Sequence, residues 1–230
     1  MKKSNFMILI VFLALLPITL YVGMHISGRG YYITGTAIIV ELMLPFFMRF
    51  EGRKVEAREL VVVAVLCALA VGGRVVIPVP NFKAAFAIII ISGISFGPET
   101  GYMVGAITAL VSNFFYGQGP YTPWQMMAYG AGGMLTGFIF LNKRMRKESW
   151  LLALVGFVIV VAWIGPLLDS SQVFLMMPEV NKITFAAALV SGFPINVSQG
   201  ICTAFILYFF GNPLLDKLER IKLKYGIMEE

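Results

Sequence analysis

The sequence has little charge. Of its 230 residues, 13% are Asp, Glu, Lys or Arg, and 59% are hydrophobic. Soluble domains carry about a quarter charged residues, so this composition excludes an ordinary soluble protein. A helix that crosses a bilayer needs about 20 apolar residues. The chain is therefore long enough for about eight such helices with short connections, and too short for an additional soluble domain.

Residues that bind metals and nucleotides are also scarce. The chain has one histidine, His25, and two cysteines, Cys67 and Cys202, which both fall in apolar runs. This excludes a Cys/His zinc site and a disulfide framework. No GxxxxGK[ST], GxSxG or HExxH sequence occurs. We therefore expect no enzymatic activity and no cofactor, and any active transport must draw its energy from ATP used by partner chains or from an ion gradient.

Eight apolar runs predict an all-α, polytopic membrane bundle. They span residues 6–24, 31–48, 58–77, 84–97, 100–116, 123–141, 150–168 and 183–210, to within a few residues. The last run is long and contains Gly192 and Pro194, which predict a kink. A charged link, Glu51 to Glu59, divides the chain into two N-terminal helices, residues 1–50, and a six-helix substrate-binding domain, residues 51–230.

The basic residues predict the orientation. Fourteen of the 18 fall at the N-terminus, in two connections and in the C-terminal tail: Lys2, Lys3, Arg49, Arg53, Lys54, Arg58, Lys143, Arg144, Arg146, Lys147, Lys217, Arg220, Lys222 and Lys224. The remaining four, Arg29, Arg74, Lys83 and Lys182, fall on the opposite side. Lys and Arg favour the cytoplasmic side. We therefore predict a multi-pass protein of the cell membrane, with both termini cytoplasmic and an even number of spans.

The first run also has the Lys-rich start of a signal peptide. No small-x-small cleavage site follows it, and Tyr21, Val22 and His25 continue instead. We therefore interpret residues 6–24 as a retained helix, since cleavage would leave an odd number of spans.

Small residues recur at helical spacing. One stripe is Ala64, Ala68 and Gly72; others are Gly97, Gly101, Gly105 and Ala109, and Gly133 with Gly137. Such stripes let helices approach closely in lipid. Each stripe is therefore either internal packing or a docking surface, and the Ala64 stripe, which opens the six-helix part, is the best docking candidate.

Two outer connections and the last run carry the candidate substrate-binding residues. Amides and aromatic rings suit a neutral or zwitterionic organic ligand, and they gather at Asn113, Tyr116, Gln118, Tyr121, Trp124 and Gln125. The stiff connection with Arg74, Asn81, Phe82 and Lys83 is either a lid over this site or a simple connector. Asn196 and Gln199 share one helix face and either line a cavity or form a structural hydrogen bond.

These segments resemble the substrate-binding S components of energy-coupling factor (ECF) vitamin transporters, most closely the cobalamin-type ones. The resemblance covers about residues 55–225 and is carried by Arg58-Glu59-Leu60, Gly73-Arg74, Pro80-Asn81-Phe82-Lys83, Phe96-Gly97-Pro98-Glu99, residues 111–126 and Ser191-Gly192-Phe193-Pro194-Ile195-Asn196. It implies a six-helix bundle with an outward-facing vitamin site, capped by residues 74–83. It also implies docking through Ala64 and Ala68 to an ECF transmembrane coupling protein that two ATPase subunits drive. The two additional N-terminal helices depart from the family's pattern.

Two other functions remain open at this stage. An autonomous, ion-coupled carrier of a small organic solute would use Glu41, the one acid well inside an apolar run; a structural partner or a protonated acid is the simpler interpretation of that residue. A membrane enzyme acting on lipids would need clustered acids or histidines, but His25, Asp169 and Glu179 are scattered. We expect a vitamin or related micronutrient, with cobalamin or a precursor as the first candidate, and no nucleic acid as partner.

Overall fold

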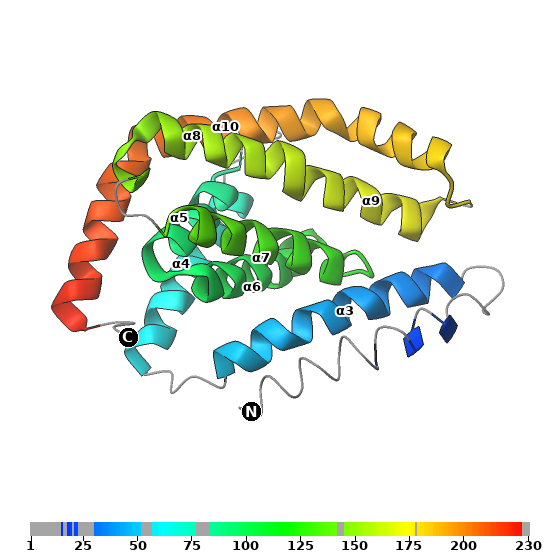
Figure 1. Cartoon of the computed structure of the whole chain (residues 1–230), viewed down its shortest axis with the longest axis horizontal. Coiled ribbons are helices and arrows are strands. Elements are labelled where there is room, and N and C mark those ends of the chain that lie inside the picture. The colour runs from blue at the N-terminus through cyan, green and yellow to red at the C-terminus, as the bar shows by residue number, and fades with distance from the viewer. Residues whose placement is uncertain are drawn as a thin grey trace.

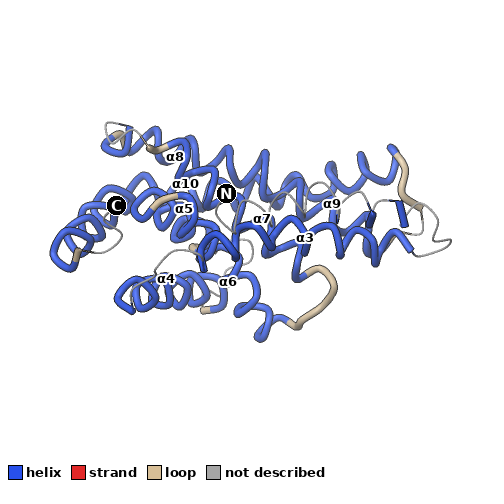
Figure 2. Tube along the Cα trace, turned by 60° about the horizontal axis from the view of Figure 1, so that its bottom comes forward, coloured by secondary structure: helices blue, strands red, loops and turns tan. Residues whose placement is uncertain are grey.

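A computed structural model describes residues 30–51, 57–76, 83–141, 145–177 and 179–226, together with residues 15, 18, 19, 21 and 22. Within these ranges every regular element is a helix (Figure 2). The α-helices are α3 (Gly30–Glu51), α4 (Ala57–Val75), α5 (Ala85–Phe96), α6 (Pro98–Tyr116), α7 (Thr122–Ile139), α8 (Ser149–Ile159), α9 (Gly165–Met176) and α10 (Lys182–Tyr225). The all-α prediction is confirmed for these residues. Most of the predicted span 6–24 lies outside them, so the eight-span count stays a prediction.

Local sequence explains where several helices begin and end. Gly97 adopts φ 97° between α5 and α6, a conformation that favours glycine, and Pro98 follows at the start of α6. Gly117 adopts φ 99° directly after α6. The Asn181 side chain accepts hydrogen bonds from the N–H groups of Ile183 and Thr184, which caps the start of α10.

A π-helical turn, Val160–Ile164, joins α8 and α9 into one continuous helix. Gly165 donates its N–H to the carbonyl of Val160, five residues earlier. Pro166 has no N–H to donate, and a wide turn before it accommodates the missing hydrogen bond. The predicted span 150–168 therefore continues as helix to Met176, beyond the predicted end.

Helix α10 has 44 residues and contains Pro194 and Pro213. It runs along α8 and α9 and then turns sharply towards its red end (Figure 1). A proline ring clashes with the carbonyl four residues earlier, which for Pro213 is Phe209, and the turn lies in this part of the helix. The last helix is therefore bent, and the bend predicted at Gly192 and Pro194 stays a prediction. Beyond the turn, the Tyr225 carbonyl accepts a hydrogen bond of 2.6 Å from Arg58 Nη1 at the start of α4.

Glycines bring the backbones of α5, α6 and α7 into contact at the centre of the molecule (Figure 1). A Cβ atom at Gly101 would lie 2.5 Å from the Gly133 carbonyl oxygen, and one at Gly105 would lie 2.4 Å from the Tyr129 carbonyl oxygen. Only glycine permits this approach. Internal packing is therefore confirmed for the stripes that contain Gly101, Gly105 and Gly133.

Two helices, Ser149–Met176 and Lys182–Tyr225, are long and apolar enough to cross a membrane by length and composition, and α5 is a shorter apolar helix. Large apolar side chains are exposed on α4, α8 and α10, among them Leu69, Trp150 and Phe209. Water would make such a surface costly, whereas lipid accommodates it. The surface thus fits the membrane prediction.

Candidate functional site

Three helix ends meet around Arg74, which lies at the C-terminal end of α4. Its Nη1 donates to Ser112 Oγ and, over 3.1 Å, to Asn113 Oδ1 near the end of α6. Asn113 Nδ2 in turn donates to Thr122 Oγ1 at 3.1 Å and to Gln125 Oε1 at 2.8 Å, both at the start of α7. We call Arg74, Ser112, Asn113, Thr122 and Gln125 the Arg74 network.

The centre of the Arg74 network is buried. Arg74 is 7% exposed and Asn113 is fully buried. Buried polar groups destabilise a protein unless they are hydrogen-bonded, and here each residue provides the partner of the next. The network therefore fixes the relative positions of α4, α6 and α7 at this end of the bundle.

The connection between α6 and α7 is attached to the same network. Thr122 Oγ1 accepts from the Gly119 N–H at 3.2 Å and donates to Gln118 Oε1 at 2.9 Å. Gln118 Nε2 donates to the Leu110 carbonyl at 2.9 Å. Tyr121 donates its hydroxyl to the Gly117 carbonyl at 2.6 Å. Side-chain hydrogen bonds thus hold residues 117–122 in one conformation.

Two cations lie against the ring of Tyr116. The guanidinium carbon of Arg74 is 5.2 Å from the ring centroid and Lys83 Nζ is 4.7 Å from it. The Tyr129 ring is 5.3 Å from the same guanidinium, and the Tyr116 hydroxyl donates to the Arg74 carbonyl at 2.8 Å. Burial, together with the charge of Arg74, lowers the pKa of the Lys83 ammonium from its usual value. This end of α4 is therefore strongly positive and lined by aromatic rings.

Trp124 does not join this group. Its ring stacks on Phe174 of α9, with centroids 5.3 Å apart, and a Cβ atom at Gly35 of α3 would lie 3.3 Å from Trp124 Cζ2. Consecutive helical residues point about 100° apart, so Gln125 faces Asn113 while Trp124 faces away. The structure places Trp124 as a packing residue between α3, α7 and α9.

Asn196 also lies apart from the Arg74 network. Its Nδ2 donates to Asp169 Oδ2 at 2.7 Å, and both side chains are buried. A Cβ atom at Gly192 would lie 2.2 Å from Asp169 Oδ1, and one at Gly165 would lie 2.3 Å from Asn196 Cγ. The pair therefore fills space that these glycines leave between α9 and α10. Of the two interpretations of Asn196, the structure shows the structural hydrogen bond; Gln199 is half-buried.

The structure thus brings together Arg74, Lys83, Asn113, Tyr116, Gln118, Tyr121 and Gln125 among the predicted site residues. Asn81 and Phe82 lie outside the described residues. Ser112, Thr122, Tyr129 and Asp169 were not among the site residues predicted from the sequence. For two of these a signal existed, since Thr122, Gln125 and Tyr129 are spaced three and then four apart and so share a helix face.

The predicted docking residues lie on an uncovered face of α4. Ala64 and Ala68 are exposed, and a Cβ atom at Gly72 would have no neighbour within 4 Å. Val61, Val65 and Leu69 flank them and are also exposed. In the part of the chain that the structure describes, nothing packs on this face.

Glu41 lies on α3, away from the Arg74 network. It is 8% exposed and accepts a hydrogen bond of 2.5 Å from Thr19 Oγ1, while its Oε2 is buried with no hydrogen-bond partner among the described residues. The hydrogen bond from Thr19 fits the interpretation that Glu41 has a structural partner.

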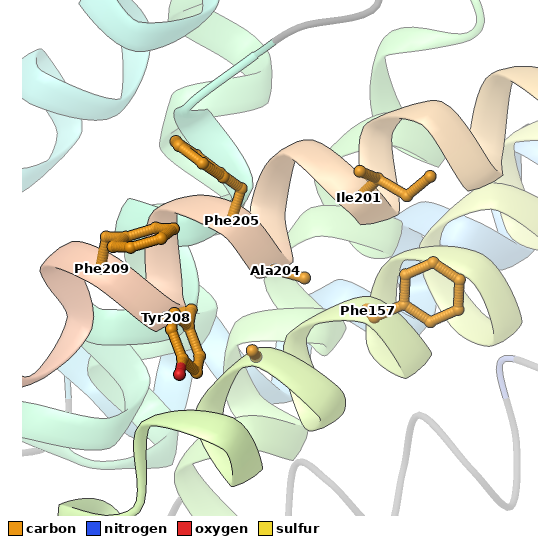
Figure 3. Close-up of a pocket in the computed structure, with 7 residues that line it drawn as sticks. Phe157, Ile201, Ala204, Phe205, Tyr208 and Phe209 are labelled. Carbon is orange, nitrogen blue, oxygen red and sulfur yellow. The ribbon is translucent and has the colours of Figure 1, made fainter.

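Two surface hollows lie elsewhere, along α10. One of them, between α8 and α10, is drawn in Figure 3 and is lined by Ala153, Phe157, Ile201, Ala204, Phe205, Tyr208 and Phe209. The other lies beside it, at Pro194, Val197, Ser198, Ile201, Cys202 and Phe205. Their walls are almost wholly apolar and belong to helices long enough to cross a membrane. They offer little to orient a polar ligand, and we base the candidate site on the Arg74 network instead.

Comparison with known proteins finds relatives that match about half of the chain. Similar proteins include UPF0397 proteins of Aliivibrio fischeri (strain MJ11; 32% identical over 111 residues), Vibrio atlanticus (31% over 111 residues) and Aliivibrio salmonicida (31% over 117 residues). These matches cover 46–47% of this chain and 60–63% of the relatives. No solved structure matches.

The family model of the ECF-type riboflavin transporter, S component, matches residues 54–216, which include α4 to α9 and most of α10 but not α3. The chain therefore belongs to the family of ECF-type transporter S components.

Proposed function

We propose that this chain captures a vitamin or related micronutrient at the Arg74 end of the bundle and delivers it inward together with a shared ATP-driven module. The observation that carries the proposal is the Arg74 network, a buried polar cluster at the meeting point of three helix ends. Ligand sites of this type combine a few fixed polar groups with aromatic rings. ATP hydrolysis belongs to partner chains in this scheme, and the chain itself is not an enzyme.

The positive-inside rule supports an orientation with the Arg74 end outside the cell. Among the described residues, Arg58 at the start of α4 and Lys222 and Lys224 in the last turn of α10 lie at the opposite end. In this orientation both termini are cytoplasmic and a vitamin reaches Tyr116 and Gln118, which are exposed, from outside the cell.

Two vitamins are the first candidates. The family description names riboflavin, whereas the sequence motifs most resemble cobalamin-type S components. Riboflavin offers a flat ring for the tyrosines, and cobalamin or a precursor offers several amides for Gln118, Gln125 and Asn113. Isothermal titration of the purified chain with a vitamin panel that includes both compounds tests the proposal. We expect one member to bind with sub-micromolar affinity, and a panel without any such ligand contradicts the proposed function.

Docking to the coupling protein would use the uncovered face of α4. Ala64, Ala68 and Gly72 leave a shallow, smooth strip there, which suits close contact between helices in lipid. Replacing Ala68 with leucine should abolish vitamin uptake in cells and leave binding by the purified chain unchanged. Ala187→Leu is the matched control, because Ala187 is also an exposed alanine in an apolar helix. Loss of binding in the Ala68 variant would instead make the strip part of the internal packing.

An autonomous ion-coupled carrier is the second candidate, because Glu41 Oε2 is a buried carboxylate oxygen in an apolar helix and has no hydrogen-bond partner within the described parts of the chain. Such a carrier would work without partner chains. Uptake by the chain reconstituted alone in vesicles, abolished by a protonophore and by Glu41→Gln, would support it. Uptake that requires the ATP-driven module and survives Glu41→Gln would exclude it.

A further inference from the structure

The positive charge at the Arg74 end has no negative partner among the residues that the structure describes. Arg74 and Lys83 lie against the same tyrosine ring, and the hydrogen-bond acceptors of Arg74, Ser112 and Asn113, are neutral. Among the residues that the structure describes, no carboxylate forms an ion pair with either cation. The connection 77–82 reads Ile-Pro-Val-Pro-Asn-Phe and adds no acid.

The acids in the nearby turns and helix ends pair with other groups in the described structure. The connection 117–121 contains none. In the connection between α9 and α10, Glu179 Oε2 accepts from Asn181 Nδ2 at 3.4 Å. Asp169, within α9, is bonded to Asn196. The two acids on this side of the chain are thus paired with amides of α10 or the turn before it.

A second observation concerns the guanidinium of Arg74 itself. The Arg74 side chain is only 7% exposed, and its buried Nε has no hydrogen-bond partner among the described residues. A buried donor without an acceptor is costly, and more so when it carries charge. Guanidinium groups bind carboxylates and phosphates through two parallel hydrogen bonds. Arg74 therefore has unused donor capacity that an oxyanion would satisfy.

We propose that the ligand of this chain carries an anionic group, a carboxylate or a phosphate, which Arg74 and Lys83 receive. The inference rests on the proposed function and specifies its substrate class. Tyr116 and Tyr129 stabilise the guanidinium through cation–π contacts. The anion supplies the missing counter-charge, whereas the amides of Gln118 and Gln125 contact the neutral part of the molecule.

The first experiment needs no knowledge of the vitamin. Thermal unfolding of the purified chain in a neutral detergent is followed in sodium phosphate, sodium acetate and sodium chloride at equal ionic strength and pH. We expect phosphate, acetate or both to raise the unfolding temperature above that in chloride, because a ligand that binds only the folded state stabilises it. The anion that raises the unfolding temperature more indicates whether the ligand carries a phosphate or a carboxylate.

Charge-removing variants locate the effect. Lys83→Gln should abolish most of the anion-dependent rise, whereas Lys182→Gln should retain it, because Lys182 is an exposed lysine at the start of α10. Lys83 is the safer variant, since Arg74→Gln also removes hydrogen bonds to α6 and its folding has to be checked first. An equal unfolding temperature in all three salts overturns the inference, as does a rise that Lys83→Gln retains.

The second experiment compares related ligands of which one carries an additional anionic group. The pairs are riboflavin with its phosphate ester FMN, and cobinamide with cobyric acid, which has a free carboxylate. We expect the anionic member to bind about 10-fold more tightly or better, a difference of about 1.4 kcal/mol, and Lys83→Gln to remove that preference because it removes a charge-assisted contact.

The two proposals fail separately. If a neutral vitamin binds below the micromolar range and Lys83→Gln leaves its affinity unchanged, the anion inference is wrong and the vitamin function stands. If no vitamin binds but phosphate or acetate stabilises the chain through Lys83, the anion site stands and the vitamin function is wrong.

Discussion

Replacing Asn113 with alanine is the most direct perturbation of the Arg74 network. Asn113 is fully buried, and its side chain makes three hydrogen bonds, to Arg74, Thr122 and Gln125. The substitution removes all three and leaves Ser112 as the remaining hydrogen-bond acceptor of the Arg74 guanidinium in the described structure. We expect the ends of α4, α6 and α7 to loosen together.

The loss can be worked out from the individual contacts. A hydrogen bond to a charged group contributes about 1.5–3 kcal/mol, and a neutral one about 1 kcal/mol. In membrane proteins the average contribution falls to about 0.6 kcal/mol. For one charge-assisted and two neutral bonds, the free energy of unfolding should therefore fall by about 3 kcal/mol, between these limits. At roughly 2–4 °C per kcal/mol for a chain of this size, the unfolding temperature should fall by about 6–12 °C.

The assay is thermal unfolding of the purified chain in detergent, followed by helical circular dichroism. Gln118→Ala is the matched control, because Gln118 is an exposed amide at the rim of the same network. Its loss should cost less than about 1 kcal/mol, as for a solvated hydrogen bond. An Asn113→Ala protein that unfolds at the wild-type temperature would refute the idea that this network joins the three helices.

Three further predictions follow from the packing and the caps. Gly101→Ala should lower the unfolding temperature by several degrees, because the new methyl group would lie 2.5 Å from a backbone oxygen of α7, whereas Gly72→Ala, with no neighbour within 4 Å, should leave it unchanged or raise it slightly. Asn181→Ala should cost about 1 kcal/mol in chemical denaturation, since it removes the N-cap of α10, and Asn181→Ser should restore most of that loss. Asn196→Ala should destabilise the chain by about 1–3 kcal/mol by leaving the buried Asp169 without its amide donor, and Asn196→Gln should fail to rescue it because Gly165 leaves no additional space.

The sequence was most informative where one physical rule dominates. Apolar runs predicted α5 and α6 to within about two residues, because the need to satisfy backbone hydrogen bonds in lipid leaves few alternatives to a helix. Glycines at helical spacing predicted close helix contacts, and Gly101 and Gly133 make them. These features depend on local composition and period, which a single sequence contains.

Features that depend on the rotation of a helix were not predictable in the same way. Trp124 and Gln125 are neighbours in a segment rich in polar and aromatic residues, yet they face different partners. Asp169 and Asn196 are 27 positions apart in the sequence, and they meet only because of how α9 and α10 are aligned against each other. The length of α10 and its late turn likewise depend on packing and on Pro213 rather than on hydrophobicity alone.

The hydrogen bond between Arg58 and Tyr225 brings two distant parts of the sequence together. The end of α10 lies beside the start of α4 (Figure 1), and Ala64 follows Arg58 by about 9 Å of helical rise. A fluorophore attached near Tyr225 would therefore sit close to the start of α4. If a coupling protein docks on Ala64 and Ala68, as proposed, such a label would report its arrival in real time, and a bulky fusion at the same place would obstruct it.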